Sequence, residues 1–167
     1  VTLTPSPALD SATSIAHLCP DKKRRCSEPS HAPGGGGINV ARAIHNLGGN
    51  SLAIFPAGGP PGRHLTDLLL AEGIACQPVS IQAWTRQCFN VDEQAHGQQY
   101  RFVLPGAQLS NTEQDRLLST VQSVDHFDYL VISGSHPDGL AADFLPRVVQ
   151  LANQRGARCI LDSSGAA

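Results

Sequence analysis

The hydrophobic pattern alternates between short apolar runs and longer stretches with helical spacing. Residues 38–47 place Val40, Ala41, Ile44 and Leu47 on one stripe of a helix, and a Gly-Gly pair follows directly. Glycine after the last periodic residue is typical of a helix end. The pattern therefore predicts a helix over 38–47.

The rest of the chain continues the alternation of strand and helix. Ser110 and Glu113 have the spacing of a capping box and predict a helix through Val121. Pro146 lies inside another helical stretch and is expected to kink it. The remaining predicted elements are a strand at 52–55, a helix at 62–73, a strand at 129–133, a helix at 139–156 and a strand at 157–165.

One segment breaks this rhythm. Residues 87–105, "QCFNVDEQAHGQQYRFVLP", contain two β-prone runs on either side of a polar turn with Gly97. This pattern predicts a hairpin, either at the edge of the sheet or as a protruding flap.

Alternating strands and helices favour an α/β fold, in which a parallel sheet carries helices on both faces. Ligands of such sheets bind beyond the carboxyl ends of the strands. Those ends read "PAGG", "SGSHPDG" and "DSSG", all rich in glycine, serine or aspartate. We therefore expect a binding site at this edge.

Composition narrows the function classes. The chain has 167 residues, of which 41% are hydrophobic and 16% charged, and its net charge is −2, so we expect one globular domain that binds neither nucleic acid nor membrane. No secretory signal is evident, and the missing start methionine suggests a trimmed or partial chain. Five cysteines without a CxxC pair predict buried, inert thiols in a reducing cytoplasm. Seven scattered histidines do not predict a zinc site.

The glycine run at residues 34–37 stands at the start of the first predicted helix. It lacks the lysine of a P-loop, and Asn39 stands where a Rossmann fingerprint needs a small residue. Two interpretations remain open: a flexible connector, or a bare helix N-terminus that binds an anion or polar ligand with help from Asn39. The basic run at residues 22–25 is likewise either solvated surface or a contact for a small phosphorylated ligand.

Several stretches occur together in a familiar order: "TPSPALDSAT", "PGGGGINVARAIHNLGG", "AIFPAGG", "WTRQ", "YRFVLPGA" and "VISGSHPDG". Along its whole length the chain resembles the ribokinase-like, PfkB-type carbohydrate kinases. The resemblance implies a three-layer α/β/α fold with a mostly parallel sheet and a small β-lid from segments near 13–32 and 85–105. Lids of this family often pair between subunits, which implies a homodimer.

The resemblance also implies an activity, the ATP- and Mg²⁺-dependent phosphorylation of fructose 6-phosphate to fructose 1,6-bisphosphate. Many relatives that act on other sugar phosphates carry a lysine in the glycine run, whereas all four positions are glycine here. Tagatose 6-phosphate stays open as a substrate. The implied substrate-binding residues are Asp10 for the sugar hydroxyls, Gly35, Gly36 and Asn39 against the sugar, Lys23 and Arg86 near its phosphate, and Ser135. Asp162 matches an acidic position near the metal and phosphate network.

Some of these residues have simpler explanations: Asp10 as a turn cap, Ser135 as part of a loop, Arg86 as a rim charge. The chain also departs from the family pattern. It has His136, Pro137 and Asp138 where Leu-Pro-Pro is usual, and Cys19 where an aromatic residue is common in the lid.

The family's nucleotide-binding half should carry an Asn-x-x-Glu segment and a later Gly-Ala-Gly-Asp that holds the catalytic base. Both are expected to be missing, because the chain stops just after Asp-Ser-Ser-Gly. We therefore expect residues 1–167 to be the sugar-binding part of a kinase domain, inactive and poorly soluble by itself. The alternative is a truncated, non-catalytic domain that binds a sugar phosphate or a partner.

Overall fold

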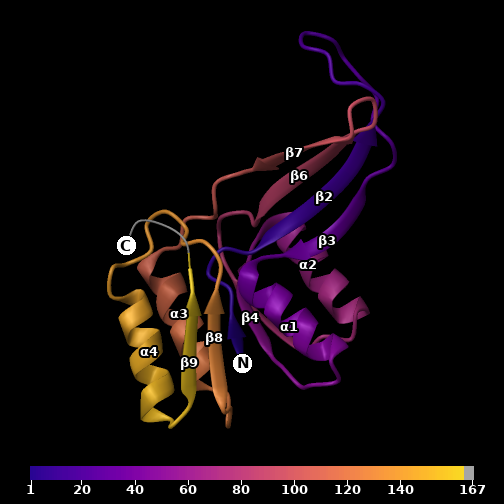
Figure 1. Ribbon diagram of the computed structural model, residues 1–167. Helices are drawn as coiled ribbons and strands as arrows, with labels where there is room; N and C mark the ends of the chain where they lie inside the picture. The colour runs from indigo at the N-terminus through magenta and orange to yellow at the C-terminus, as the bar shows by residue number, and fades with distance from the viewer. Residues whose placement is uncertain (164–167) are drawn as a thin grey trace.

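The computed structural model, which describes residues 1–163, contains two β-sheets that meet near one end of the larger sheet (Figure 1). Sheet A has five parallel strands in the order β5-β4-β1-β8-β9. Its strands are β1 (Thr2–Leu3), β4 (Ala53–Ala57), β5 (Cys76–Ser80), β8 (Tyr129–Ser133) and β9 (Arg158–Asp162). The parallel sheet predicted from the alternating pattern is therefore confirmed.

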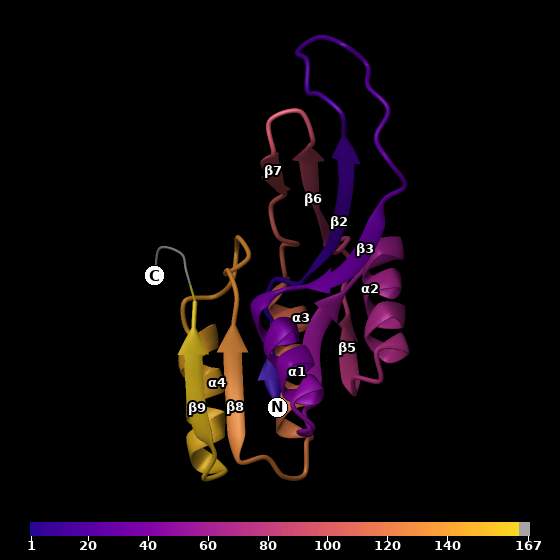
Figure 2. The same ribbon diagram turned by 45° about the vertical axis from the view of Figure 1, so that its right-hand side comes forward.

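Sheet B projects away from sheet A and has four strands in the order β3-β2-β6-β7. They are β2 (Ala8–Ile15), β3 (Ser30–Gly34), β6 (Arg86–Glu93) and β7 (Gln98–Val103). β2 pairs in parallel with β6 and antiparallel with β3. β6 and β7 form the predicted hairpin. Figure 2 shows the loop between β2 and β3 at the end of sheet B farthest from sheet A.

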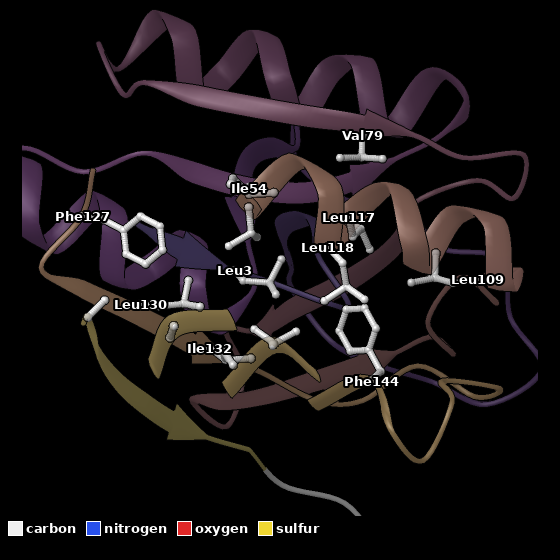
Figure 3. Packing of buried hydrophobic residues seen from close by; sticks show 14 of the residues in the cluster. Leu3, Ile54, Val79, Leu109, Leu117, Leu118, Phe127, Leu130, Ile132 and Phe144 are labelled. Atoms are coloured by element: carbon white, nitrogen blue, oxygen red, sulfur yellow. The ribbon is translucent and has the colours of Figure 1, made fainter. Parts of the chain in front are cut away.

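Helices cover both faces of sheet A. On one face α3 (Asn111–Gln122) and α4 (Phe144–Gln154) bury Leu117, Leu118 and Phe144 against the sheet (Figure 3). On the other face α1 (Gly36–Asn46) and α2 (Gly59–Ala71) pack in a second cluster. Side chains alternate across a strand, so Ile54 of β4 joins the first cluster and its neighbour Phe55 the second.

Two sequence features of the helices have different outcomes. The capping box is confirmed: Ser110 Oγ accepts from the Glu113 N–H, and the Glu113 carboxylate accepts from the Ser110 N–H. The prediction of a kink at Pro146 is wrong, because α4 begins only at Phe144 and Pro146 lies in its first turn. An amide nitrogen there has no helical partner in any case, so a proline is tolerated.

The five cysteines carry no disulfide, but the prediction that they are buried holds only for Cys88. Cys26 is exposed, and the other three are half-buried. Within residues 1–163, every helix is too short or too polar to cross a lipid bilayer.

Candidate functional site

The topology of sheet A singles out one place for a ligand. From β1 the chain moves outward to β4 and β5, and later it returns to the other side of β1 to form β8 and β9. The strand order therefore reverses between β1 and β8. In open α/β sheets, ligands bind at such a switch point beyond the carboxyl ends of the strands.

The glycine run brings the N-terminus of α1 to this switch point. A Cβ at Gly36 would lie 2.7 Å from the Gly134 amide nitrogen after β8, and one at Gly37 would lie 2.7 Å from the Leu3 carbonyl oxygen of β1. Gly35, the N-cap residue, has a φ of 121°, and no side chain caps the helix. Of the two interpretations of the run, the structure thus supports a bare helix N-terminus held close to the sheet.

Asp10 lies next to the same glycines. It sits on β2, half-buried, and a Cβ at Gly34 would lie 2.7 Å from its Cγ. Burial raises the pKa of Asp10, while the nearby Arg86 guanidinium and the Cys88 thiol act in the opposite direction. A carboxylate that is partly desolvated and only partly compensated is a strong acceptor for hydroxyl groups.

Arg86 connects sheet B to the loop after β8. Its Nη2 donates to the Ser6 carbonyl at 3.1 Å and to the Ser135 hydroxyl at 3.2 Å. The Arg86 Nε is buried and has no hydrogen-bond partner in residues 1–163. A buried guanidinium nitrogen without a partner is costly, which makes this side chain receptive to an anion.

Asp162 is the last residue of β9 and lies beside the glycine run through Ser133. Ser133 Oγ donates to Asp162 Oδ2 at 3.0 Å, and the Gly134 N–H donates to the Asp162 carbonyl at 3.1 Å. In the loop that departs from the family pattern, the His136 ring contacts the Ser163 hydroxyl at 2.7 Å.

Two of the predicted residues, Asn39 and Lys23, are exposed to solvent. Asn39 is exposed in the first turn of α1, so it stands at the mouth of the site. Lys23 is exposed on the loop that follows β2. Asp10 and Ile15 are separated by roughly 17 Å of extended strand before that loop begins, so Lys23 does not join the other residues within this chain.

Sequence reasoning missed the buried hydroxyls beneath the site. Thr4 and Ser6 follow β1, and neither hydroxyl has a hydrogen-bond partner among residues 1–163. The stretch "TPSPALD" could have indicated these two hydroxyls, because it places small polar residues directly after the end of β1. A surface hollow of about 410 Å³ is lined by part of the "PAGG" strand end together with Arg63 and Asp67, but by none of the individual residues predicted for the site.

The letters Asn-x-x-Glu do occur in the chain, contrary to the expectation that the segment is missing. They fall at Asn90–Glu93, on β6 of sheet B and not at the edge of sheet A. This match does not supply the nucleotide-binding segment that the resemblance implies, because it lies away from the edge of sheet A where ligands of such sheets bind.

Comparison with known proteins agrees with this geometry. The model of the pfkB family of carbohydrate kinases matches residues 7–167. The chain belongs to this family. Sheet A with helices on both faces is thus the ribokinase-like layer architecture that the sequence implied, and sheet B is its additional β-structure.

Curated relatives include two bacterial kinases. The chain is 49% identical over 166 residues to ATP-dependent 6-phosphofructokinase isozyme 2 of Escherichia coli, covering 99% of this chain and 54% of the relative. It is 45% identical to the isozyme 2 of Mycobacterium tuberculosis, covering 99% of this chain and 49% of that protein. The chain thus spans about half the length of the relatives it matches.

Solved structures show the same fold. Phosphofructokinase-2 from E. coli in complex with fructose-6-phosphate superimposes with a TM-score of 0.93 over 99% of this chain and 55% of that one, at 49% identity. The tetrameric inhibited form of the same enzyme gives a TM-score of 0.92, covering 98% of this chain and 54% of that one at 49% identity. A putative phosphofructokinase from Staphylococcus aureus gives 0.87 at 26% identity, covering 96% of this chain and 51% of that one.

Proposed function

We propose that this chain is the sugar-binding part of an ATP-dependent kinase that converts fructose 6-phosphate to fructose 1,6-bisphosphate. One observation carries the proposal: Asp10, the bare N-terminus of α1 and the Arg86 guanidinium lie at a single edge, at the switch point of sheet A. The similarity to 6-phosphofructokinases over 99% of the chain supports this choice of substrate.

Each group has a distinct task in this proposal. Asp10 accepts hydrogen bonds from sugar hydroxyls, and its closeness to Gly34 fixes the carboxylate against the backbone. Gly35 and Gly36 let the start of α1 pack closely on the sheet, because a Cβ at Gly35 would clash with Thr4 and one at Gly36 with Ser133. In this proposal the sugar lies against the bare main chain that they provide. Asn39 adds a directed hydrogen bond from the first turn of α1. Arg86 pairs with the sugar's phosphate, with Ser135 holding its guanidinium in place.

ATP supplies the transferred phosphoryl group, and Mg²⁺ neutralises its negative charge when both are bound. Asp162 suits an indirect role in that network. It is exposed, and one of its oxygens accepts from Ser133, which leaves the other for a metal-bound water. Mg²⁺ usually keeps several waters and takes one or two carboxylates, so the Asp162 carboxylate fits that donor set.

We propose that sheet B is the lid of the site and the contact between two copies of the chain. Its exposed apolar side chains include Phe89 and Phe102, which are paired across β6 and β7. β3 and β7 are both edge strands of sheet B, so their outer edges are open to further pairing. A homodimer through this surface would exclude water from the sugar, which protects the phosphoryl group from hydrolysis.

A chimeric enzyme tests the function. Residues 1–163 replace the matching part of the E. coli relative, and a coupled assay measures phosphorylation of fructose 6-phosphate and of tagatose 6-phosphate. We expect ATP-dependent turnover with the higher kcat/KM for fructose 6-phosphate, and loss of turnover in the Asp10→Asn chimera. Higher kcat/KM for tagatose 6-phosphate, or turnover that survives Asp10→Asn, would reject the assignment.

A further inference from the structure

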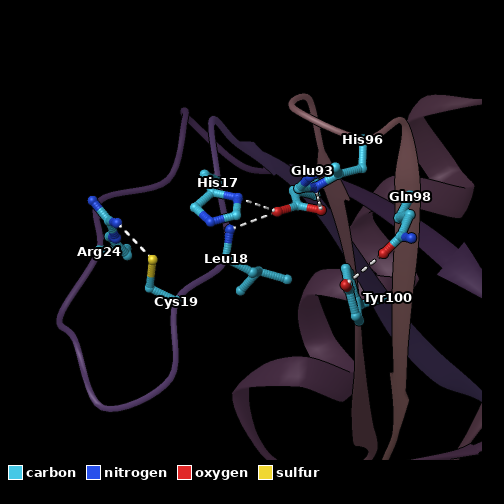
Figure 4. Close-up of polar contacts among 8 residues, drawn as sticks. All are labelled: His17, Leu18, Cys19, Arg24, Glu93, His96, Gln98 and Tyr100. Carbon is cyan, nitrogen blue, oxygen red and sulfur yellow. Dashed lines mark hydrogen bonds and ion pairs between the residues drawn. The ribbon is translucent and has the colours of Figure 1, made fainter.

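Figure 4 shows a second cluster of reactive side chains, which lies where β2 and β6 end. Glu93 ends β6, and its side chain is only 2% exposed. Its Oε1 lies 2.7 Å from the His17 Nδ1, and its Oε2 lies 3.0 Å from the His96 Nδ1. His17 comes from the loop after β2, and His96 from the turn between β6 and β7.

The partners of Glu93 are unusual for a buried carboxylate. Buried carboxylates normally pair with arginine or lysine, or coordinate a metal. The ion pairs of Glu93 within residues 1–163 involve only the two imidazoles. The Leu18 N–H also donates to Oε1 at 2.9 Å, which fixes the orientation of the carboxylate.

We propose that His17, Glu93 and His96 bind one divalent transition-metal ion of the Zn²⁺ type. The three donor atoms lie within 4.8 Å of one another, so small side-chain rotations would bring each to the distance of about 2.0–2.2 Å that one ion requires. Two imidazole nitrogens and one carboxylate oxygen form a donor set that suits zinc, cobalt or nickel and not the oxygen-seeking Mg²⁺ or Ca²⁺.

The surroundings of the cluster suit such an ion. The His17 and His96 side chains are 49% and 58% exposed, so an ion can enter from solvent. The Leu18 N–H acts as an outer hydrogen bond that orients a ligating carboxylate, a common feature of metal sites. The ion would fasten the loop at residues 16–29 to the β6–β7 turn. The backbone hydrogen bond from Ala95 to Ala16 and the hydrogen bond from Leu18 to Glu93 already join the two segments.

Calorimetric titration of the 167-residue chain with ZnCl₂ tests the site, together with the visible spectrum of the Co²⁺ complex. Cys19 and Cys26 lie in the same loop and are competing soft ligands, so a Cys19→Ser/Cys26→Ser chain is the reference protein. We expect one equivalent of Zn²⁺ to bind, unaffected by excess Mg²⁺. Glu93→Gln and His96→Ala should each weaken binding at least tenfold.

The control is His126→Ala, since His126 is an exposed histidine paired with Asp128 and remote from sheet B. It should leave Zn²⁺ affinity unchanged. Zn²⁺ should also slow tryptic cleavage at residues 22–25 in the reference chain but not in the Glu93→Gln chain. If Glu93→Gln does not fold, the Zn²⁺ affinities of His17→Ala and His96→Ala test the site instead. Both rings are exposed, so their removal should leave the fold intact. No saturable Zn²⁺ binding, or binding retained in the His17→Ala/His96→Ala chain, would overturn the proposal and leave an ordinary ion-pair cluster.

Discussion

The Arg86 guanidinium donates to the Ser135 hydroxyl at 3.2 Å and so joins two residues that are 49 positions apart in the chain. The same Nη2 donates to the Ser6 carbonyl, so the first strand of the hairpin is tied to the loops after both β1 and β8. A guanidinium presents its donors in a rigid planar fork, whereas a lysine ammonium is a point charge on a flexible stem.

Arg86→Lys should therefore weaken binding of fructose 6-phosphate at least tenfold although it keeps the charge, and Arg86→Ala should weaken it further. The residual affinity of Arg86→Lys should fall as salt is raised, because a more exposed ion pair is screened. Calorimetry at two salt concentrations measures both effects. Arg116→Ala, an exposed arginine on α3, is the control and should bind normally. Equal affinity in wild type and Arg86→Lys would show that the guanidinium does not hold the phosphate.

The Asp10 carboxylate should strengthen sugar binding but lower the stability of the folded chain at neutral pH. Its pKa in the folded chain is raised, mainly by burial, so the folded state holds its proton more tightly than the unfolded state does. The stability of the fold therefore falls as pH rises from 3.8, the pKa of Asp10 in the unfolded chain, through its higher pKa in the folded chain. Above that range the loss is complete.

Asp10→Asn should accordingly leave the melting temperature at pH 7 equal or higher and flatten its change across this acidic range. Sugar binding should weaken by roughly ten- to a hundredfold, because hydrogen bonds to a charged acceptor contribute about 1.5–3 kcal/mol. Thermal denaturation at several pH values and calorimetry measure the two effects. A lower melting temperature at pH 7 would mean that Asp10 is a structural ion-pair residue.

Gly36→Ala should disturb the junction of α1 with β8. The added methyl group would lie 2.7 Å from the Gly134 nitrogen, and this main-chain atom cannot move aside easily. We expect a loss of about 1–3 kcal/mol in unfolding free energy and a larger loss of sugar affinity. Gly97→Asn is the control, since no atom lies within 4 Å of a Cβ there and asparagine tolerates the positive φ of 63°. Urea titration measures the stability of both variants. Equal stability would contradict the close approach of Gly36 to the Gly134 main chain.

Glu113→Gln should destabilise the fold by about 2 kcal/mol, measured by urea titration at pH 7. Burial opposes ionisation of Glu113, but the N–H groups of Gln82 and Ser110 outweigh it and hold its pKa below the usual value of 4.5. The stabilisation is thus present above pH 4.5 and is lost as pH falls through the lowered folded pKa. Asp143→Asn, at an N-cap without a capping hydrogen bond, should have little effect. Equal losses in the two variants would argue against the capping box.

The elements that the sequence predicted are those with long, regular patterns. The helices and the strands at β4, β8 and β9 have clear periodicity, and the β6–β7 hairpin has its glycine turn. β1 and β2 were missed. Thr2–Leu3 is too short to show a pattern, and Ala8–Ile15 mixes small and polar residues without a clear apolar run. β3 and β5 were missed because each has only five residues, contains a proline and shows no apolar run, and both are edge strands, where proline is tolerated.

The candidate site was predictable only where residues lie on a recognisable motif. Asp10, Arg86 and the glycine run converge at one edge, but Lys23 lies beyond the far end of β2. The cluster of His17, Glu93 and His96 left no signal in the sequence. His17 and Glu93 are 76 positions apart in the chain, and the parallel pairing of β2 with β6 brings their segments together.

The most direct test of the proposed site is calorimetric titration of the folded 167-residue chain with fructose 6-phosphate, alongside its Asp10→Asn and Arg86→Ala variants. We predict one binding site per chain, at least tenfold weaker in each variant. In a coupled assay with ATP and Mg²⁺ we predict no turnover, because residues 1–167 contain no Gly-Ala-Gly-Asp segment. Failure of the folded wild-type chain to bind fructose 6-phosphate, or unchanged affinity in both variants, would contradict a sugar-phosphate site at this edge.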